Sequence, residues 1–139
     1  MITRYDRPLI AQLRKHEGVR SKPYKDTVGK ITIGVGRNLD DKGLSDDEIN
    51  MLLSNDIKDA MEDAVALVPS FWGLTENRQR VLVDMAFNLG RARLGKFVNT
   101  LAAVERGDYE AAAAGMMASK WARQVKGRAV TLSEMMKQG

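Results

Sequence analysis

The sequence predicts an α+β fold in which one helix and a small antiparallel β-hairpin precede an all-helical body. Alternation with a period of two is confined to residues 31–35, and the segments after residue 44 repeat their apolar residues at helical spacing. The chain of 139 residues has the length of one domain. We therefore expect a single domain over residues 1–139. Its predicted parts are a hairpin lobe at about 18–43, a long connecting helix at about 46–68, and a helical lobe at about 70–139 that packs with the first helix.

The first helix is predicted between Asp6 and Gly18. Asp6 is a favourable N-cap, and glycine is a common residue just past a helix end. Ile10, Leu13 and Glu17 follow one another at spacings of three and four, so they share one face of this helix. Glu17 is thus the acidic residue on an otherwise apolar face.

A short hairpin is predicted from Tyr24 to Val35. Ile31, Ile33 and Val35 alternate with Thr32 and Gly34, which is the pattern of a strand with one buried face. The preceding residues 27–30 contain a glycine and form the turn. No segment after Arg37 has the pattern of a strand.

The start of the long connecting helix has the strongest local signal in the chain. Ser45 and Glu48 form a capping box, and Leu44 with Ile49 forms the hydrophobic staple around it. The helix is expected to end near Pro69, which gives it a length of roughly 33 Å. Further helices are predicted at Thr75–Leu89, Leu94–Glu105, Tyr109–Ala122 and Thr131–Met136.

Composition excludes several classes of protein. The chain has no cysteine and one histidine, so we expect no disulfide, no metal site and no cofactor. No apolar run approaches the roughly 20 residues of a membrane-spanning helix, and the first 20 residues lack the apolar core of a signal peptide. The net charge of +4 is uneven, because residues 44–64 hold seven acidic residues and one basic residue between two basic segments. Such a balance favours either an ordinary solvated surface or attraction to a polyanion.

Three residues of the N-terminal segment are candidates for acid–base chemistry. Burial of Glu17 would raise its pKa and keep it protonated, as a general acid requires, although a glutamate that ends a helix in solvent is the commoner case. Asp26 and Thr32 lie on opposite sides of the hairpin turn, where a carboxylate and a hydroxyl can hold a water molecule between them. Gly34 and Gly36 leave one face of the strand bare, which indicates close approach by a ligand or by another backbone.

Residues 17–36 carry these candidates in the order Glu-Gly, Tyr-x-Asp and Thr-Ile-Gly-x-Gly. This segment closely resembles the active-site signature of the T-even phage lysozymes, glycoside hydrolase family 24. The resemblance continues through Asn88-Leu89-Gly90, Phe97-Val98-Asn99, Ser119-Lys120-Trp121 and Arg128-Ala129, and so covers nearly the whole chain. It implies a lysozyme-like fold.

The resemblance also implies catalytic roles. Glu17 is expected to protonate the glycosidic oxygen, Asp26 to activate water on the other face of the sugar, and Thr32 to help hold that water. Family members invert the anomeric centre, which requires a separation of roughly 6.5–9.5 Å between the carboxylates. Arg128 matches the arginine that pairs with the catalytic glutamate, and Gly34 belongs to the predicted cleft.

One departure from the family affects the predicted cleft. A histidine commonly follows the Gly-x-Gly of this family and pairs with an aspartate early in the long helix. The corresponding residues here are Arg37 and Asp56, which we expect to form an ion pair that stays charged at every working pH.

The predicted function is that of an endolysin, a muramidase that hydrolyses the β-1,4 bond between N-acetylmuramic acid and N-acetylglucosamine and lyses the host. We expect a monomer made in the host cytoplasm without a signal peptide, released by a holin, and acting on peptidoglycan in the periplasm. It should have no nucleic-acid partner and no stable membrane insertion. A lytic transglycosylase is the nearer alternative, although Asp26 argues against it. A basic helical nucleic-acid-binding protein is an alternative of another class, which would leave Glu17, Asp26 and Thr32 unexplained.

Overall fold

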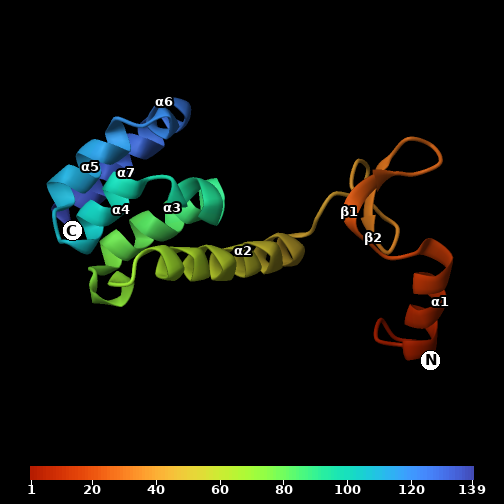
Figure 1. Cartoon of the computed structure of the whole chain (residues 1–139). Helices are drawn as coiled ribbons and strands as arrows, with labels where there is room; N and C mark the ends of the chain where they lie inside the picture. The colour runs from red at the N-terminus through yellow and green to blue at the C-terminus, as the bar shows by residue number, and fades with distance from the viewer. The chain divides into compact units, whose positions relative to one another are not determined.

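The computed structural model describes all 139 residues and divides into two compact units, Met1–Asn50 and Met51–Gly139. The chain contains seven α-helices and one small antiparallel sheet, which confirms the predicted α+β class (Figure 1). The sheet belongs to the first unit and most of the helices belong to the second. No helix combines the length and the apolar character needed to cross a membrane.

The first unit consists of helix α1 (Arg7–Glu17) and a sheet of strands β1 (Arg20–Lys25), β2 (Ile31–Gly34) and β3 (Arg37–Asn38) in the order β1-β2-β3. Asp6 caps α1 as predicted, because its carboxylate accepts a hydrogen bond of 2.9 Å from the backbone N–H of Leu9. Gly18 ends the helix with a positive φ of 76°. The last residue of α1, Glu17, therefore lies immediately before the sheet.

The third strand was not predicted from the sequence. It contains two residues, of which Asn38 pairs with Thr32 and Arg37 pairs with Ile33. A strand of two residues is too short to show alternation, so it has no sequence signal of its own. It forms because Gly36, with a φ of 68°, turns the chain back alongside β2.

Helix α2 (Asp46–Leu67) begins in the first unit and continues into the second. Its start confirms the predicted capping box. The backbone N–H of Glu48 donates to the Ser45 hydroxyl at 3.2 Å, and the Glu48 carboxylate accepts from the backbone N–H of Ser45 at 2.9 Å.

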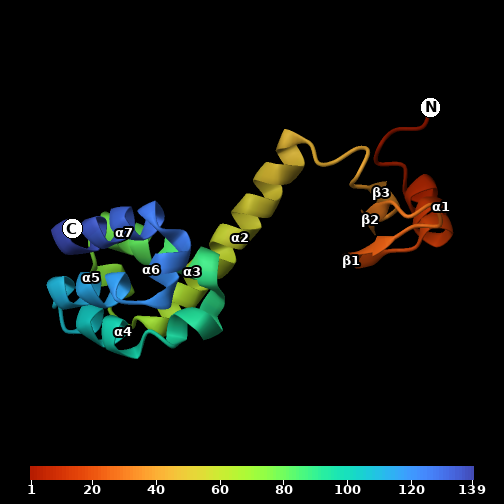
Figure 2. The same cartoon turned by 90° about the horizontal axis from the view of Figure 1, so that it is seen from above.

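The second unit is helical (Figure 2). It also holds the hydrophobic core. After α2 come the 3-10 turn η1 (Phe71–Gly73) and helices α3 (Glu76–Gly95), α4 (Val98–Glu105), α5 (Tyr109–Met117), α6 (Lys120–Val125) and α7 (Gly127–Gln138). Helix α5 packs against both α4 and α7. The largest fully buried side chains of this core are Phe71, Leu82, Met85, Leu94, Met116 and Met136.

The helix boundaries of the second unit differ from the prediction in several places. The segment predicted as one helix over Tyr109–Ala122 forms two helices, because the Ser119 side chain accepts from the backbone N–H of Ala122 and starts α6. The predicted short helix at Thr131–Met136 is the end of the longer α7. Helix α3 also continues past its predicted end, although Gly90 interrupts it with a non-helical φ of 79°.

Candidate active site

Glu17 lies with its carboxyl group against the backbone of Gly36. A β-carbon built on Gly36 would come within 2.7 Å of the Glu17 Oε2 atom, a distance that real β-carbons do not reach. Glycine is thus required at this position both by the positive φ of 68° and by the space that Glu17 occupies. The sequence predicted a close approach by a ligand or another backbone at Gly34 and Gly36. At Gly36 the group that approaches is instead a side chain of the same unit, and nothing lies within 4 Å of a β-carbon built on Gly34.

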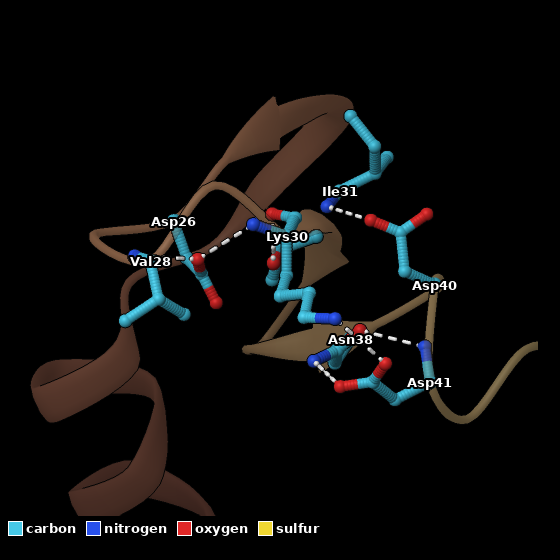
Figure 3. A network of polar contacts seen from close by, with 8 residues as sticks. Asp26, Val28, Lys30, Ile31, Asn38, Asp40 and Asp41 are labelled. Atoms are coloured by element: carbon cyan, nitrogen blue, oxygen red, sulfur yellow. Dashed lines mark hydrogen bonds and ion pairs between the residues drawn. The ribbon is translucent and has the colours of Figure 1, made fainter.

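Asp26 is held by the turn between β1 and β2. Its Oδ1 atom accepts hydrogen bonds from the backbone N–H groups of Val28 at 3.0 Å and Lys30 at 2.9 Å (Figure 3). These bonds orient the carboxylate through one oxygen, which is the ordinary chemistry of an aspartate in a turn. The Oδ2 atom makes no hydrogen bond within the protein, so it is free to accept one from water.

Thr32 lies next to Asp26 because both groups bind the same carbonyl oxygen. The Thr32 hydroxyl donates to the carbonyl of Lys30 at 3.0 Å, and the backbone N–H of Asp26 donates to that carbonyl at 2.9 Å. Thr32 is 4% exposed and is the one buried residue of the first unit. Its hydroxyl uses its hydrogen in the bond to the carbonyl and retains its lone pairs as acceptors. The pairing of Thr32 with Asp26 that the resemblance implies is therefore geometrically possible within this unit.

An acidic loop after β3 stabilises the same turn. The Lys30 ammonium group binds the Asp41 carboxylate at 3.1 Å, and the Asp40 carboxylate accepts from the backbone N–H of Ile31 at 2.8 Å (Figure 3). The hydrogen bond to Asp41 raises the pKa of Lys30 above its usual range. Nothing in the sequence indicated this network, because aspartates in a loop carry no signal for partners nine and eleven residues away. No group of three or more histidine, cysteine or acidic side chains is arranged to hold a metal ion.

Arg37 forms a two-pronged ion pair with Glu48. Both terminal nitrogens of the guanidinium group lie 2.7 Å from the Glu48 carboxylate oxygens, and one of them also donates to the carbonyl of Gly43 at 3.1 Å. The sequence predicted Asp56 as the partner of Arg37, and in the structure the partner is Glu48. Asp56 is exposed on α2 in the second unit. Sequence reasoning assigned Glu48 to the capping box alone, but its carboxylate serves both the cap and the arginine.

The Arg37–Glu48 pair predicts a specific dependence of stability on pH. The hydrogen bond from Arg37, followed by those from Ser45, lowers the pKa of Glu48 from about 4.5 to about 2. A lowered carboxyl pKa stabilises the folded state above the unfolded value near 4.5, and this contribution is lost as the pH falls toward 2. We expect the Glu48→Gln variant to melt below the wild type at pH 6, and the difference to shrink steadily between pH 4.5 and 2.

Thermal unfolding followed by circular dichroism from pH 2 to 7 measures this difference. Asp47→Asn is the matched control, because Asp47 is the exposed neighbour of Glu48 in the same helical turn and forms no ion pair. If the difference in melting temperature between Glu48→Gln and the wild type stays constant down to pH 2, protonation of Glu48 does not affect the stability of the folded state.

Arg128 is bound to Asp84 within the second unit. Its guanidinium Nε donates to the Asp84 carboxylate at 2.8 Å, and a terminal nitrogen donates to the Asp84 carbonyl at 3.3 Å. Both residues line a cavity of about 620 Å³ among α2, α3 and α7. The predicted pairs of Arg128 with Glu17 and of Arg37 with Asp56 would join the two units, and both stay predictions.

Comparisons with known proteins agree in pointing to one family. The model of the phage lysozyme family matches residues 14–136. The pre-baseplate central spike protein Gp5 of Enterobacteria phage T4 is 31% identical over 149 residues, which cover 87% of this chain and 26% of that protein. The peptidoglycan hydrolase gp36 of Pseudomonas phage phiKMV is 30% identical over 125 residues, covering 85% of this chain and 14% of that protein. The probable T4-type lysozyme 2 of Dictyostelium discoideum is 26% identical over 145 residues, which cover 84% of this chain and 85% of that protein.

The chain is therefore much shorter than the first two relatives, of which it spans about a quarter and about a seventh. The third relative is matched over most of its length. The matched range contains the three predicted catalytic residues, Glu17, Asp26 and Thr32. It also contains the supporting residue Arg128.

Proposed function

We propose, because this chain belongs to the phage lysozyme family, that it is a glycoside hydrolase that cleaves the β-1,4 bond between N-acetylmuramic acid and N-acetylglucosamine in bacterial peptidoglycan. The observation that carries the proposal is the family match over residues 14–136, which includes the whole Glu-Gly, Tyr-x-Asp and Thr-Ile-Gly-x-Gly segment. One relative, gp36 of Pseudomonas phage phiKMV, is a peptidoglycan hydrolase, which supports the same substrate class.

The chemistry assigns one role to each of three side chains. Glu17 gives a proton to the glycosidic oxygen as the bond from that oxygen to the anomeric carbon breaks. A water molecule attacks the anomeric carbon from the opposite face and gives its proton to Asp26. Thr32 accepts a hydrogen bond from that water and holds it in line. The product then has an inverted anomeric centre, and both carboxyl groups return to their starting state after proton exchange with solvent.

The geometry of the first unit supports these roles. The free Oδ2 of Asp26 is available to a water molecule, while its Oδ1 is fixed by two backbone hydrogen bonds. The Thr32 hydroxyl, bound to the same Lys30 carbonyl as the Asp26 N–H group, can offer only a lone pair to that water. Glu17 is exposed and lies against Gly36, so its carboxyl group is accessible from solvent. Gly34, Arg37, Asp56 and Arg128 are proposed as supporting residues of the cleft.

Product analysis tests the function directly. Purified peptidoglycan is digested, the new ends are reduced with borohydride, and the fragments are separated and identified by mass spectrometry. We expect N-acetylmuramitol at the new ends, and nuclear magnetic resonance of the unreduced product should show the α-anomer first, as inversion requires. Fragments with 1,6-anhydro ends would identify a lytic transglycosylase instead. No release of fragments, together with salt-dependent binding to duplex DNA, would support the nucleic-acid-binding alternative.

The route to the wall is also a proposal. The family resemblance implies action on the cell wall as a monomer, after a holin has opened the inner membrane. Lysis by expressed protein only when a holin is expressed with it would support this route, and lysis without a holin would contradict it.

A further inference from the structure

The backbone of Lys30 holds both residues that are proposed to bind the attacking water. Its carbonyl accepts hydrogen bonds from the backbone N–H of Asp26 at 2.9 Å and from the hydroxyl of Thr32 at 3.0 Å. Its N–H donates to the Asp26 carboxylate at 2.9 Å. The position of the Lys30 backbone therefore decides where the carboxylate and the hydroxyl lie relative to each other.

The other side of the same peptide group is bound by Asp40. The Lys30 carbonyl and the Ile31 N–H belong to one planar trans peptide group, so they point in opposite directions. The Ile31 N–H donates to the Asp40 Oδ2 atom at 2.8 Å, and Asp26 and Asp40 thus lie on opposite sides of this group (Figure 3). A planar group that is held on both sides cannot rotate or shift without straining a hydrogen bond.

The loop that carries Asp40 is itself fixed on both sides of that residue. The backbone N–H of Leu39 donates to the Ile31 carbonyl at 2.7 Å. The backbone N–H of Asp41 donates to the side-chain oxygen of Asn38 at 3.0 Å. Because its two neighbours are bound in this way, Asp40 presents its carboxylate to Ile31 from a fixed backbone.

The hydrogen bond between Ile31 and Asp40 is of the stronger kind. Hydrogen bonds to an ionised carboxylate are shorter and roughly twice as strong as those between neutral groups. A peptide N–H that is bound to a negative charge also polarises its peptide group, which makes the carbonyl at the other end a better acceptor. Asp40 therefore fixes the Lys30 carbonyl and strengthens the hydrogen bonds that this carbonyl accepts.

We propose that Asp40 is a positioning residue for the hydrolysis, which acts through the Lys30–Ile31 peptide group on Asp26 and Thr32. This inference rests on the proposed function, because it concerns the water that those two residues are proposed to hold. Asp40 forms no hydrogen bond with either of them, so its effect reaches them through the backbone. Its role is to keep the two groups that bind the water in one arrangement.

Asp41 provides a matched contrast in the same loop. It carries the same charge and also contacts Lys30, but it binds the ammonium group at the end of the side chain, at 3.1 Å. A flexible four-carbon stem separates that ammonium group from the backbone, so Asp41 does not hold the peptide group. Asp40 and Asp41 thus differ in the one property that the proposal requires.

The kinetics of peptidoglycan hydrolysis test the proposal. Asp40→Ala should lower kcat about tenfold and leave KM within about twofold, because water can replace the carboxylate at Ile31 but does not hold the peptide group in place. Asp40→Asn keeps an oxygen that accepts the same hydrogen bond, so it should recover most of the loss. Asp41→Ala should stay within about twofold of the wild type in both constants.

Three kinetic results would overturn the inference. They are an Asp40→Ala variant as active as the wild type, equal losses in Asp40→Ala and Asp41→Ala, and a loss in Asp40→Asn as large as that in Asp40→Ala. The first result would mean that the carboxylate does not affect the reaction. The second would assign the effect to the charge of the loop, and the third would assign it to the charge of Asp40 alone.

Hydrogen exchange of the Asp26 amide, measured by nuclear magnetic resonance, tests the same contact without catalysis. This N–H donates to the Lys30 carbonyl, so its exchange rate reports whether the carbonyl stays in place. We expect exchange at least about fivefold faster in Asp40→Ala and unchanged in Asp41→Ala. The amide of Leu13, inside α1, is the reference for general loosening of the first unit and should keep its rate.

The exchange measurement separates failure of the inference from failure of the proposed function. An unchanged Asp26 exchange rate in Asp40→Ala, or an equal acceleration at Leu13, would overturn the inference whatever the rate of hydrolysis. If the wild type does not hydrolyse peptidoglycan, the proposed function fails. Faster exchange of Asp26 in Asp40→Ala alone would then still support the effect of Asp40 on the Lys30 carbonyl.

Discussion

Replacing Gly36 with alanine is expected to reduce peptidoglycan hydrolysis at least about a hundredfold in the folded protein. The new β-carbon would lie 2.7 Å from the Glu17 Oε2 atom and 3.1 Å from the carboxyl carbon. Either the carboxyl group moves away or the turn between β2 and β3 shifts, and each change misplaces the proposed proton donor. The measurement is the initial rate of turbidity clearing by permeabilised cells, with the folded fraction determined separately.

Two reference variants make this result interpretable. Glu17→Gln keeps the shape of the side chain but cannot donate a proton, so it sets the rate expected when the proposed acid is absent. Gly107→Ala also places an alanine at a positive φ, here 77°, but no atom lies within 4 Å of its new β-carbon. Gly107 does not belong to the proposed site. It should lose about 1–2 kcal/mol of stability and keep its activity. A Gly36→Ala protein as active as Gly107→Ala would mean that the position of Glu17 is not critical.

The second large effect is expected at the contact between α4 and α5. A β-carbon on Gly115 would clash with the hydroxyl oxygen of Thr100, which is 6% exposed and cannot move into solvent freely. Gly115→Ala should therefore lower the free energy of unfolding by about 1–3 kcal/mol, as other overpacking substitutions do. Urea unfolding followed by tryptophan fluorescence measures this loss.

The clash predicts that the sign of the effect depends on residue 100. The next nearest atoms to the new β-carbon are the β-carbon and α-carbon of Thr100 at 3.5 and 3.8 Å, which are ordinary contact distances. In a Thr100→Ala background, Gly115→Ala should therefore stabilise the protein by up to about 1 kcal/mol, because alanine is the better helix former. The same destabilisation in both backgrounds would show that the hydroxyl oxygen is not the cause.

The ion pairs of the structure change how the positive charge of this chain is understood. The net charge of +4 alone is consistent with a solvated surface or with attraction to any polyanion. The structure separates cations that already have partners, such as Arg91 and Arg128, from Arg93, Lys96 and Lys120, which form no ion pair and line one cavity of about 310 Å³.

Much of the fold was predictable because its signals are local. Asp6, Ser45 and Thr75 each cap a helix by binding a backbone group three residues away, and all three caps are present. The predicted hairpin and the turn around Asp26 have the same local origin. The boundary between α5 and α6 at Ser119 was missed because an alanine-rich helical pattern continues across it. Serine is itself a favourable N-cap, so the sequence did contain a signal for this boundary.

By itself, the sequence determined the α+β class, the starts of the main helices and the segment that identifies the family. These depend on residue spacing and on contacts within a few positions of the chain. Only the tertiary structure decided that Glu48 holds Arg37, that Asp84 holds Arg128 and that Gly36 makes room for Glu17. It also decided that Arg93, Lys96 and Lys120 line one pocket. The physical reason is that a charged side chain can pair with any opposite charge that the fold brings within about 4 Å, and spacing along the chain does not say which one that is.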